Sequence, residues 1–238
     1  MPPVLMNDMS QTIYLDNNAT TPTLPEVIDV VARVMRDCHG NPGSPHRAGR
    51  QSRQVLEASR EQIAELLGAA PRELIFTSGG TEANNLALRG LTYGLSGTIA
   101  ISPGEHPSVL EVCRSPAMRT WKLHHFPVDH SWRLASVELP TDTKLAAVIL
   151  AHNETGVIQD VRPLSAACQS RGVPLHLDGV QAVGKTDVHF HDLGATTLSF
   201  GAHKFHGPRG VGGLFVREGT RLMPLLRGGH QEFERRPG

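Results

Sequence analysis

The sequence predicts an α/β fold of three layers (α/β/α), in which helices cover both faces of a mostly parallel sheet. Short runs rich in β-branched and aliphatic residues recur from residue 73 onward, and helical stretches separate several of them. Strands that alternate with helices form parallel sheets, because the crossover helices come to lie on the sheet faces. The length of 238 residues fits one large domain, alone or with part of a second.

A first helix is expected before this alternation. The strand-like segment IYLDN, at 13–17, precedes it, and Thr23 and Glu26 mark its start as a capping box. Pro25 lies in its first turn. Its apolar stripe consists of Val27, Val30, Val31 and Val34.

A second helix follows a turn-rich stretch at 39–49. Ser44 and Pro45 are expected to open it and Gly68 to end it. Its inward-facing residues are expected to be Val55, Leu56, Ile63, Leu66 and Leu67.

The remaining chain supplies seven strands and three helices. The strands are expected at 73–78, 98–102, 122–128, 145–151, 173–178, 196–200 and 213–217, and the helices at 81–91, 107–114 and 163–171. Ligands of such sheets bind at the loops after the carboxyl ends of the strands, where most of the informative motifs lie.

Composition excludes several classes of protein. Lys and Arg number 23 and so do Asp and Glu, so the chain has no basic footprint for nucleic acid or an anionic membrane. The start, MPPVLMNDMS, is unlike a signal peptide, and the longest apolar run, at 145–151, is too short to span a bilayer. Three widely spaced cysteines indicate neither a disulfide framework nor a zinc cluster. A cytoplasmic protein is expected.

The segment TSGGTEANNLAL, at 77–88, follows a strand and opens a helix. Gly79 and Gly80 let the backbone approach a ligand, the N–H groups at a helix start suit a phosphate, and Thr81 adds a hydroxyl. The same sequence is also compatible with an ordinary strand-to-helix turn in which Thr81 is the N-cap.

Asp178 stands where the apolar strand LHLD ends. A carboxylate there needs a cationic or hydrogen-bonding partner, such as a protonated pyridine nitrogen, although loop amides would also serve. Gln181 could reach the same ligand. His106 could stack on a ring or move protons, and Asn153 could donate to a ring oxygen, while structural roles remain open for both.

The segment SFGAHKFHGPRGVGG, at 199–213, places Lys204 beside His203 in a loop that is mostly glycine. A surface lysine needs no such surroundings. A lysine that must be reached by a flat, phosphorylated ligand does.

The order of these motifs resembles the class V aminotransferase group of fold type I pyridoxal phosphate enzymes, and most closely the cysteine desulfurases. The resemblance covers residues 13–238. The matching blocks are YLDNNATTP, NPGSPHRAGR, FTSGGTEANNLAL, EHPSVL, HNETGVIQDV, LDGVQAVGK, SFGAHKFHGPRGVGGLFVR and GGHQEFERRPG.

The resemblance implies a role for each candidate residue. Lys204 would be the Schiff-base lysine of pyridoxal 5'-phosphate, and Asp178 would pair with the pyridinium nitrogen. Gln181 would bond the phenolic oxygen of the ring, with Asn153 near that oxygen and the substrate. The phosphate would be held by Gly80, Thr81 and His203. His106 would stack on the ring and, with Lys204, act in proton transfer.

The resemblance also implies a reaction and partners. L-cysteine would be converted to L-alanine, with its sulfur passed to an enzyme thiol and on to an iron–sulfur scaffold or other acceptor protein. Full-length members are homodimers. Residues 1–24 would be an N-terminal arm on the small-domain side, and 25–238 the cofactor-binding large domain.

Two departures from the family pattern stand out. Members carry a serine that bonds the phosphate two residues before the His-Lys pair, and here that residue is Gly201. The lost bond would be worth about 1.5–3 kcal/mol if nothing replaced it. The family also continues beyond the point matching Gly238, through a small domain with the thiol loop and a substrate-binding arginine, so a truncated chain is expected.

Two other functions stay open at the level of sequence. One is a related class V enzyme, such as a selenocysteine lyase or an aminotransferase-like enzyme. The other is a non-catalytic relic that binds the cofactor or a partner without turnover.

Overall fold

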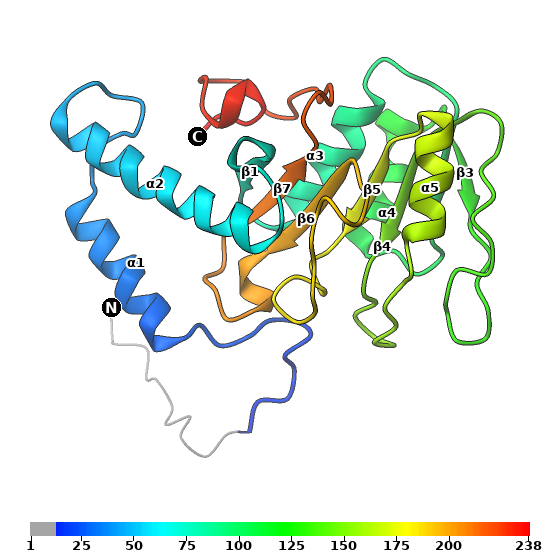
Figure 1. Cartoon of the computed structure of the whole chain (residues 1–238), viewed down its shortest axis with the longest axis horizontal. Coiled ribbons are helices and arrows are strands. Elements are labelled where there is room, and N and C mark those ends of the chain that lie inside the picture. The colour runs from blue at the N-terminus through cyan, green and yellow to red at the C-terminus, as the bar shows by residue number, and fades with distance from the viewer. Residues whose placement is uncertain (1–12) are drawn as a thin grey trace.

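The computed structural model describes residues 13–238, which form a seven-stranded sheet with helices on both faces (Figure 1). All seven predicted strands are present. They are β1 (Leu74–Thr77), β2 (Thr98–Ile101), β3 (Lys122–His125), β4 (Thr143–Ile149), β5 (Leu175–Asp178), β6 (Thr197–Gly201) and β7 (Gly212–Val216). The predicted fold class is therefore confirmed.

The sheet is mostly parallel. Its strand order is β1-β7-β6-β5-β4-β2-β3, and only β7 runs against its two neighbours, β1 and β6. Strands β1, β2, β4, β5 and β6 consequently point the same way. Their carboxyl ends meet at one edge of the sheet, and the loops that follow them can converge there.

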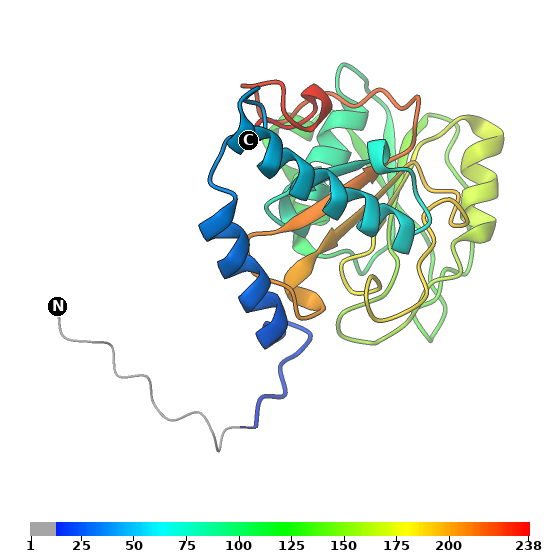
Figure 2. The same ribbon diagram turned by 60° about the vertical axis from the view of Figure 1, so that its left-hand side comes forward.

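Alternation along the strands divides the core into two layers. In β4, Leu145 and Ala147 face one cluster with α3 (Gly80–Thr92) and α4 (Pro107–Arg114), while Ala146 and Val148 face another with α5 (Arg162–Arg171). The end of α2 (Arg47–Leu66) joins the second cluster. Figure 2 shows the same elements after a turn of 60° about the vertical axis. Helices α3, α4 and α5 begin within one residue of their predicted starts.

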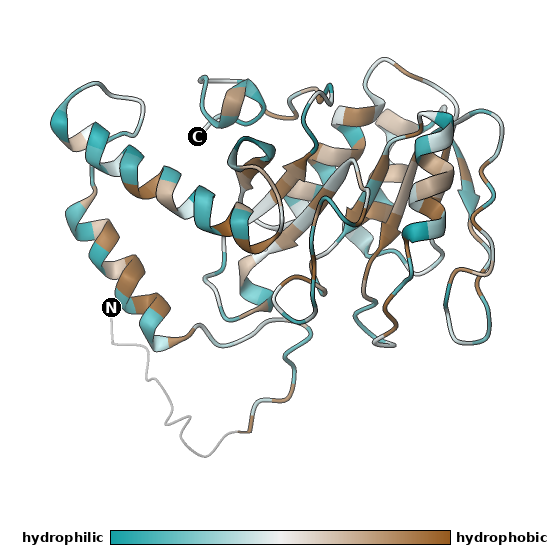
Figure 3. Cartoon of the chain, viewed as in Figure 1, coloured by the Kyte–Doolittle hydropathy of each residue, from teal (hydrophilic) through white to brown (hydrophobic). Residues whose placement is uncertain are grey.

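The first helix, α1 (Pro25–Asp37), stands apart from the sheet (Figure 3). None of its residues is buried. Pro25 is at its first position, as predicted, but the predicted capping box is wrong. Leu24 is the N-cap, and the Thr23 hydroxyl instead donates to the carbonyl of Gly207 over 3.3 Å. The strand-like reading of 13–17 is also wrong, because these residues form no strand and Ile13 and Leu15 are exposed.

The second helix begins two residues later than Ser44 and Pro45 suggested. Its N-cap is His46, whose Nδ1 accepts from the Gly49 amide over 3.1 Å. Gly68 follows the helix with φ of +60°, a left-handed conformation that suits glycine. Leu66 is exposed rather than inward-facing, while Leu67 is buried.

The described part of the chain, 13–238, also contains four short 3₁₀ turns, η1 (Pro71–Glu73), η2 (Pro116–Met118), η3 (Ala202–Lys204) and η4 (Glu232–Glu234). Among residues 13–238, every helix is too short or too polar to cross a bilayer.

Candidate functional site

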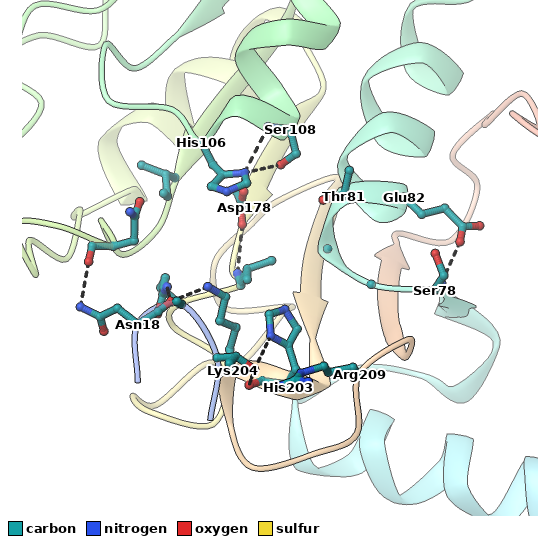
Figure 4. A pocket seen from close by; sticks show the side chains of 18 of the residues that line it. Asn18, Ser78, Thr81, Glu82, His106, Ser108, Asp178, His203, Lys204 and Arg209 are labelled. Atoms are coloured by element: carbon teal, nitrogen blue, oxygen red, sulfur yellow. Dashed lines mark hydrogen bonds between the residues drawn. The ribbon is translucent and has the colours of Figure 1, made fainter. Parts of the chain in front are cut away.

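A cavity of about 920 Å³ opens at the edge where the parallel strands end (Figure 4). The strand-end loops of β1, β2, β4, β5 and β6 contribute to it, as do Asp16, Asn18, Ala19 and Thr20 of the arm. All eight residues singled out in the sequence line this cavity. They are Gly80, Thr81, His106, Asn153, Asp178, Gln181, His203 and Lys204.

One wall of the cavity is the start of α3. Gly79 is the N-cap, with φ of +151°, so the reading of Thr81 as an N-cap is wrong. The amides of Gly80 and Thr81 have no partner within the helix, because the first N–H groups of a helix lack one. They are donors available to an anion.

Gly201, at the end of β6, lies beside this wall. A Cβ built on it would be 3.4 Å from the Gly80 nitrogen and 3.6 Å from the ring of His203, both ordinary contact distances. The site therefore has room for the Cβ of the serine that the family pattern carries there.

Asp178, the last residue of β5, is only 2 % exposed. Its carboxylate accepts from the Val180 amide over 3.0 Å and from Asn84 Nδ2 over 2.7 Å, both neutral donors. Burial raises the pKa of Asp178 above its usual value, although these bonds oppose the rise. A cation placed against this carboxylate would be held strongly.

Lys204 reaches into the cavity from η3. Its Nζ donates to the carbonyl of Asn18, which also accepts from Gln181 Nε2 over 2.8 Å. Lys185 in turn donates from Nζ to Gln181 Oε1 over 2.6 Å. Burial, followed by the charge of Lys185, lowers the pKa of Lys204 and so favours the neutral amine that acts as a nucleophile.

The N-terminal arm is fastened to the lysine loop. The Thr21 amide and hydroxyl both donate to the carbonyl of His203, over 2.8 and 2.9 Å. The same hydroxyl accepts from the His206 amide over 2.6 Å. His206 has φ of +66°, an unusual backbone for a residue with a side chain, and these bonds hold it there.

His106 is the N-cap of α4 and faces Lys204 and His203 across the cavity in Figure 4. Its Nδ1 accepts from the Ser108 amide over 3.1 Å and lies 2.7 Å from the Ser108 hydroxyl. A ring nitrogen that accepts an amide N–H carries no proton, so a neutral His106 has its proton on Nε2.

Several cavity residues were not found from the sequence. Asn18 binds through its backbone carbonyl, which no side-chain pattern reveals. Ser108 lies two residues after His106 in EHPSVL, and that spacing was an available signal. Other cavity residues missed were Asp16, Ala19, Thr20, Ser78, Glu82, Ile149, Val180 and Arg209.

The cysteines do not line the cavity. Cys113 and Cys168 are buried in the two core clusters. Burial raises the pKa of Cys113 to about 12 and that of Cys168 to about 11, so both stay protonated at neutral pH. Cys38 is half-buried after α1.

Comparison with known proteins decides the family. The profile described as aminotransferase class-V matches residues 13–235. The chain belongs to the class V aminotransferase family. A cysteine desulfurase, IscS, from Dictyoglomus turgidum is 40 % identical over 237 residues, covering 97 % of this chain and 60 % of that protein. The chain thus spans about 60 % of the length of this class V relative.

Solved structures of class V relatives share the fold. A NifS-like protein superposes with a TM-score of 0.90 at 35 % identity, over 95 % of this chain and 64 % of that one. The structure of SspA in complex with cysteine gives a TM-score of 0.90 at 30 % identity, over 95 % of this chain and 68 % of that one. The sheet is that of the large domain of fold type I pyridoxal phosphate enzymes.

Proposed function

We propose that the cavity binds pyridoxal 5'-phosphate through Lys204, and that the chain is the arm and cofactor-binding domain of a cysteine desulfurase. The observation that carries this proposal is the convergence of eight family-matched residues, from separate loops, on one cavity. The high identity to a desulfurase of Dictyoglomus turgidum supports the choice within the class V family.

The residues present fit the ring of this cofactor. Asp178 is a buried carboxylate whose hydrogen-bond donors, Asn84 and the Val180 amide, are both neutral, so no cation is hydrogen-bonded to it. A protonated ring nitrogen would supply the positive charge. Gln181 and Asn153 line the same cavity and carry amide donors suited to the ring oxygen.

The residues present also fit the phosphate. The free amides at the start of α3 would bind its oxygens, together with the hydroxyl of Thr81. Burial, with the nearby charges of Lys204 and Arg209, lowers the pKa of His203, so this imidazole would donate as a neutral group. Its Nδ1 lies 3.1 Å from the Thr20 hydroxyl.

The side chains around the cavity suit proton transfer at the α-carbon of an amino acid. Bound pyridoxal phosphate supplies an electron sink for the electrons released when that carbon loses its proton. Lys204, with its lowered pKa, would take the proton as a neutral amine. His106 would present its Nε2–H to the cavity.

L-cysteine is the proposed substrate, and L-alanine the product. The structure of a relative, SspA, in complex with cysteine supports this choice. Sulfur would pass to a cysteine thiolate of the enzyme as a persulfide, and from there to an iron–sulfur scaffold or another acceptor. We propose that the active protein is a cytoplasmic homodimer, as the family resemblance implies.

Addition of amino acids to the cofactor-loaded protein tests this proposal. L-cysteine should change the visible absorption of the wild-type protein and leave that of the Lys204→Ala variant unchanged. A response to L-selenocysteine without one to L-cysteine would favour a selenocysteine lyase. A protein that binds the cofactor but responds to neither amino acid would contradict the proposed activity and indicate a non-catalytic relic.

A further inference from the structure

Asn84 is a buried residue behind the cavity that hydrogen-bonds to three other side chains. It lies on α3, is 0 % exposed and does not line the cavity. Its Nδ2 donates to Asp178 Oδ2 over 2.7 Å and to the Ser108 hydroxyl over 2.8 Å. Its Oδ1 lies 3.0 Å from Nε2 of His176. Every polar atom of the amide is therefore used.

The direction of these bonds follows from the chemistry of the groups. An ionised carboxylate only accepts, so the amide nitrogen of Asn84 must face Asp178 and its oxygen must face His176. His176 then donates from Nε2, and its Nδ1 accepts from the Thr197 hydroxyl over 2.9 Å. Burial lowers the pKa of His176 to about 3, which keeps the imidazole neutral and consistent with these directions.

Asn84 is also linked to His106 through a chain of hydrogen bonds. Asn84 donates to the Ser108 oxygen, and the Ser108 hydroxyl lies 2.7 Å from His106 Nδ1. Because Nδ1 is already an acceptor for the Ser108 amide, the hydroxyl donates to it as well. Asn84 thus contacts Asp178, proposed to meet the ring nitrogen, directly, and contacts His106, proposed to stack on the ring, through Ser108.

We propose that Asn84, with its amide oriented by His176, is a positioning residue that holds the Asp178 carboxylate ready for a protonated ring nitrogen and, through Ser108, holds His106. This inference rests on the proposed function. The neighbouring Asn85 makes a matched contrast, because its Nδ2 bonds only to the Thr81 carbonyl within the same helix over 2.9 Å.

Asn84→Leu keeps the approximate side-chain volume and removes the donor to Asp178. Loss of a charge-assisted bond should weaken binding of pyridoxal phosphate about tenfold. Binding of an analogue whose ring nitrogen is replaced by carbon should change less than about twofold, because it has no charge for Asp178 to meet. A general packing defect would weaken both ligands alike.

A second measurement needs no cofactor. Side-chain NMR of the unloaded protein should show the pKa of Asp178 raised further in Asn84→Leu and unchanged in Asn85→Leu, because a donor to the ionised form is lost. The other ionisable groups around Asp178 are Glu105, His106 and Lys204, and both variants retain them.

The outcomes separate the two proposals. Equal weakening of cofactor and analogue by Asn84→Leu, or an Asp178 pKa equal to that of the wild type, would overturn the role of Asn84. A wild-type protein that binds neither ligand would instead refute the proposed function, while the NMR titration would still report on Asn84.

Discussion

Asp178 and Glu105 are two buried carboxyl groups at the same edge of the sheet, and their surroundings and hydrogen-bond partners differ. Asp178 faces the cavity and accepts from two neutral donors. Glu105, 7 % exposed, accepts from the Ile149 amide over 2.7 Å and from the Ser102 hydroxyl, and its Oε2 has no partner among residues 13–238. Burial, assisted by the charge of Asp178, raises the pKa of Glu105 to about 8.

The raised pKa of Glu105 predicts a pH-dependent stability. Between its ordinary pKa of 4.5 and about 8 the folded state binds the extra proton, so the free energy of unfolding falls as pH rises. Glu105→Gln removes this titration. The free energy of unfolding of the variant should therefore rise by about 3 kcal/mol relative to that of the wild type when the pH is raised from 5 to 8. Urea unfolding at both pH values measures it. A difference that does not change with pH would contradict the account.

Gly201→Ser tests whether a hydroxyl beside the α3 amides strengthens phosphate binding. The space for its Cβ is present. We expect tighter binding of pyridoxal phosphate by about 1 kcal/mol, the net worth of one hydrogen bond. Titration followed by fluorescence measures the affinity, and Gly201→Ala controls for the added carbon. Serine and alanine variants of equal affinity would show that water or backbone already fills this role.

At the scale of elements, the arm and the lysine loop form one unit although they are far apart in sequence. Thr21 makes three bonds to the backbone of 203–206, and Asn18 meets Lys204, Gln181 and Asn153. Asn18 and Thr21 of the arm therefore contact the lysine loop directly.

Thr21→Val should loosen this unit. Valine has nearly the same shape but leaves the His206 amide without its acceptor, at a cost of about 1–3 kcal/mol in the free energy of unfolding. Cofactor affinity should fall as well. Thermal unfolding and cofactor titration check both, with Thr23→Val as the control, because the Thr23 hydroxyl makes one long bond of 3.3 Å. Equal effects of the two variants would contradict the role given to Thr21.

The sequence predicted the sheet well because most of its strands, although not the edge strand β3, are buried on both faces and read as apolar runs. The predictions from sequence were wrong where a local motif suggested a structure that the tertiary contacts do not form. Ile13 and Leu15 resemble a strand but have no partner strand, and Thr23 resembles a cap but bonds to Gly207. The hydrogen bond behind the site, between Asn84 and His176, was not predicted for a related reason. Asn84 and His176 are polar residues within buried elements, and only the fold shows that they face each other.

At the scale of the whole molecule, the cavity and the cysteines are separate. Cys113 and Cys168 belong to the core, and Cys38 lies outside the cavity. A thiolate that accepts sulfur must stand next to the substrate, since small displacements of a reacting group cost about a hundredfold in rate.

Residues 1–238 as a separate polypeptide should therefore load the cofactor without releasing sulfide from L-cysteine at ordinary enzyme rates. Sulfide assays of the reconstituted polypeptide, with Lys204→Ala as the control, measure this. Lysine-dependent turnover would contradict the prediction and would identify Cys38, Cys113 or Cys168 as a sulfur acceptor.

Reduction of the cofactor-loaded protein with borohydride, followed by peptide mapping, tests the central claim most directly. The account predicts that the label lies on Lys204 alone. Lys185 is the informative alternative, because it donates to Gln181, which lines the cavity, and is close enough to lower the pKa of Lys204. A label on Lys185, or no label at saturating cofactor, would contradict the assignment of Lys204 as the cofactor-binding lysine.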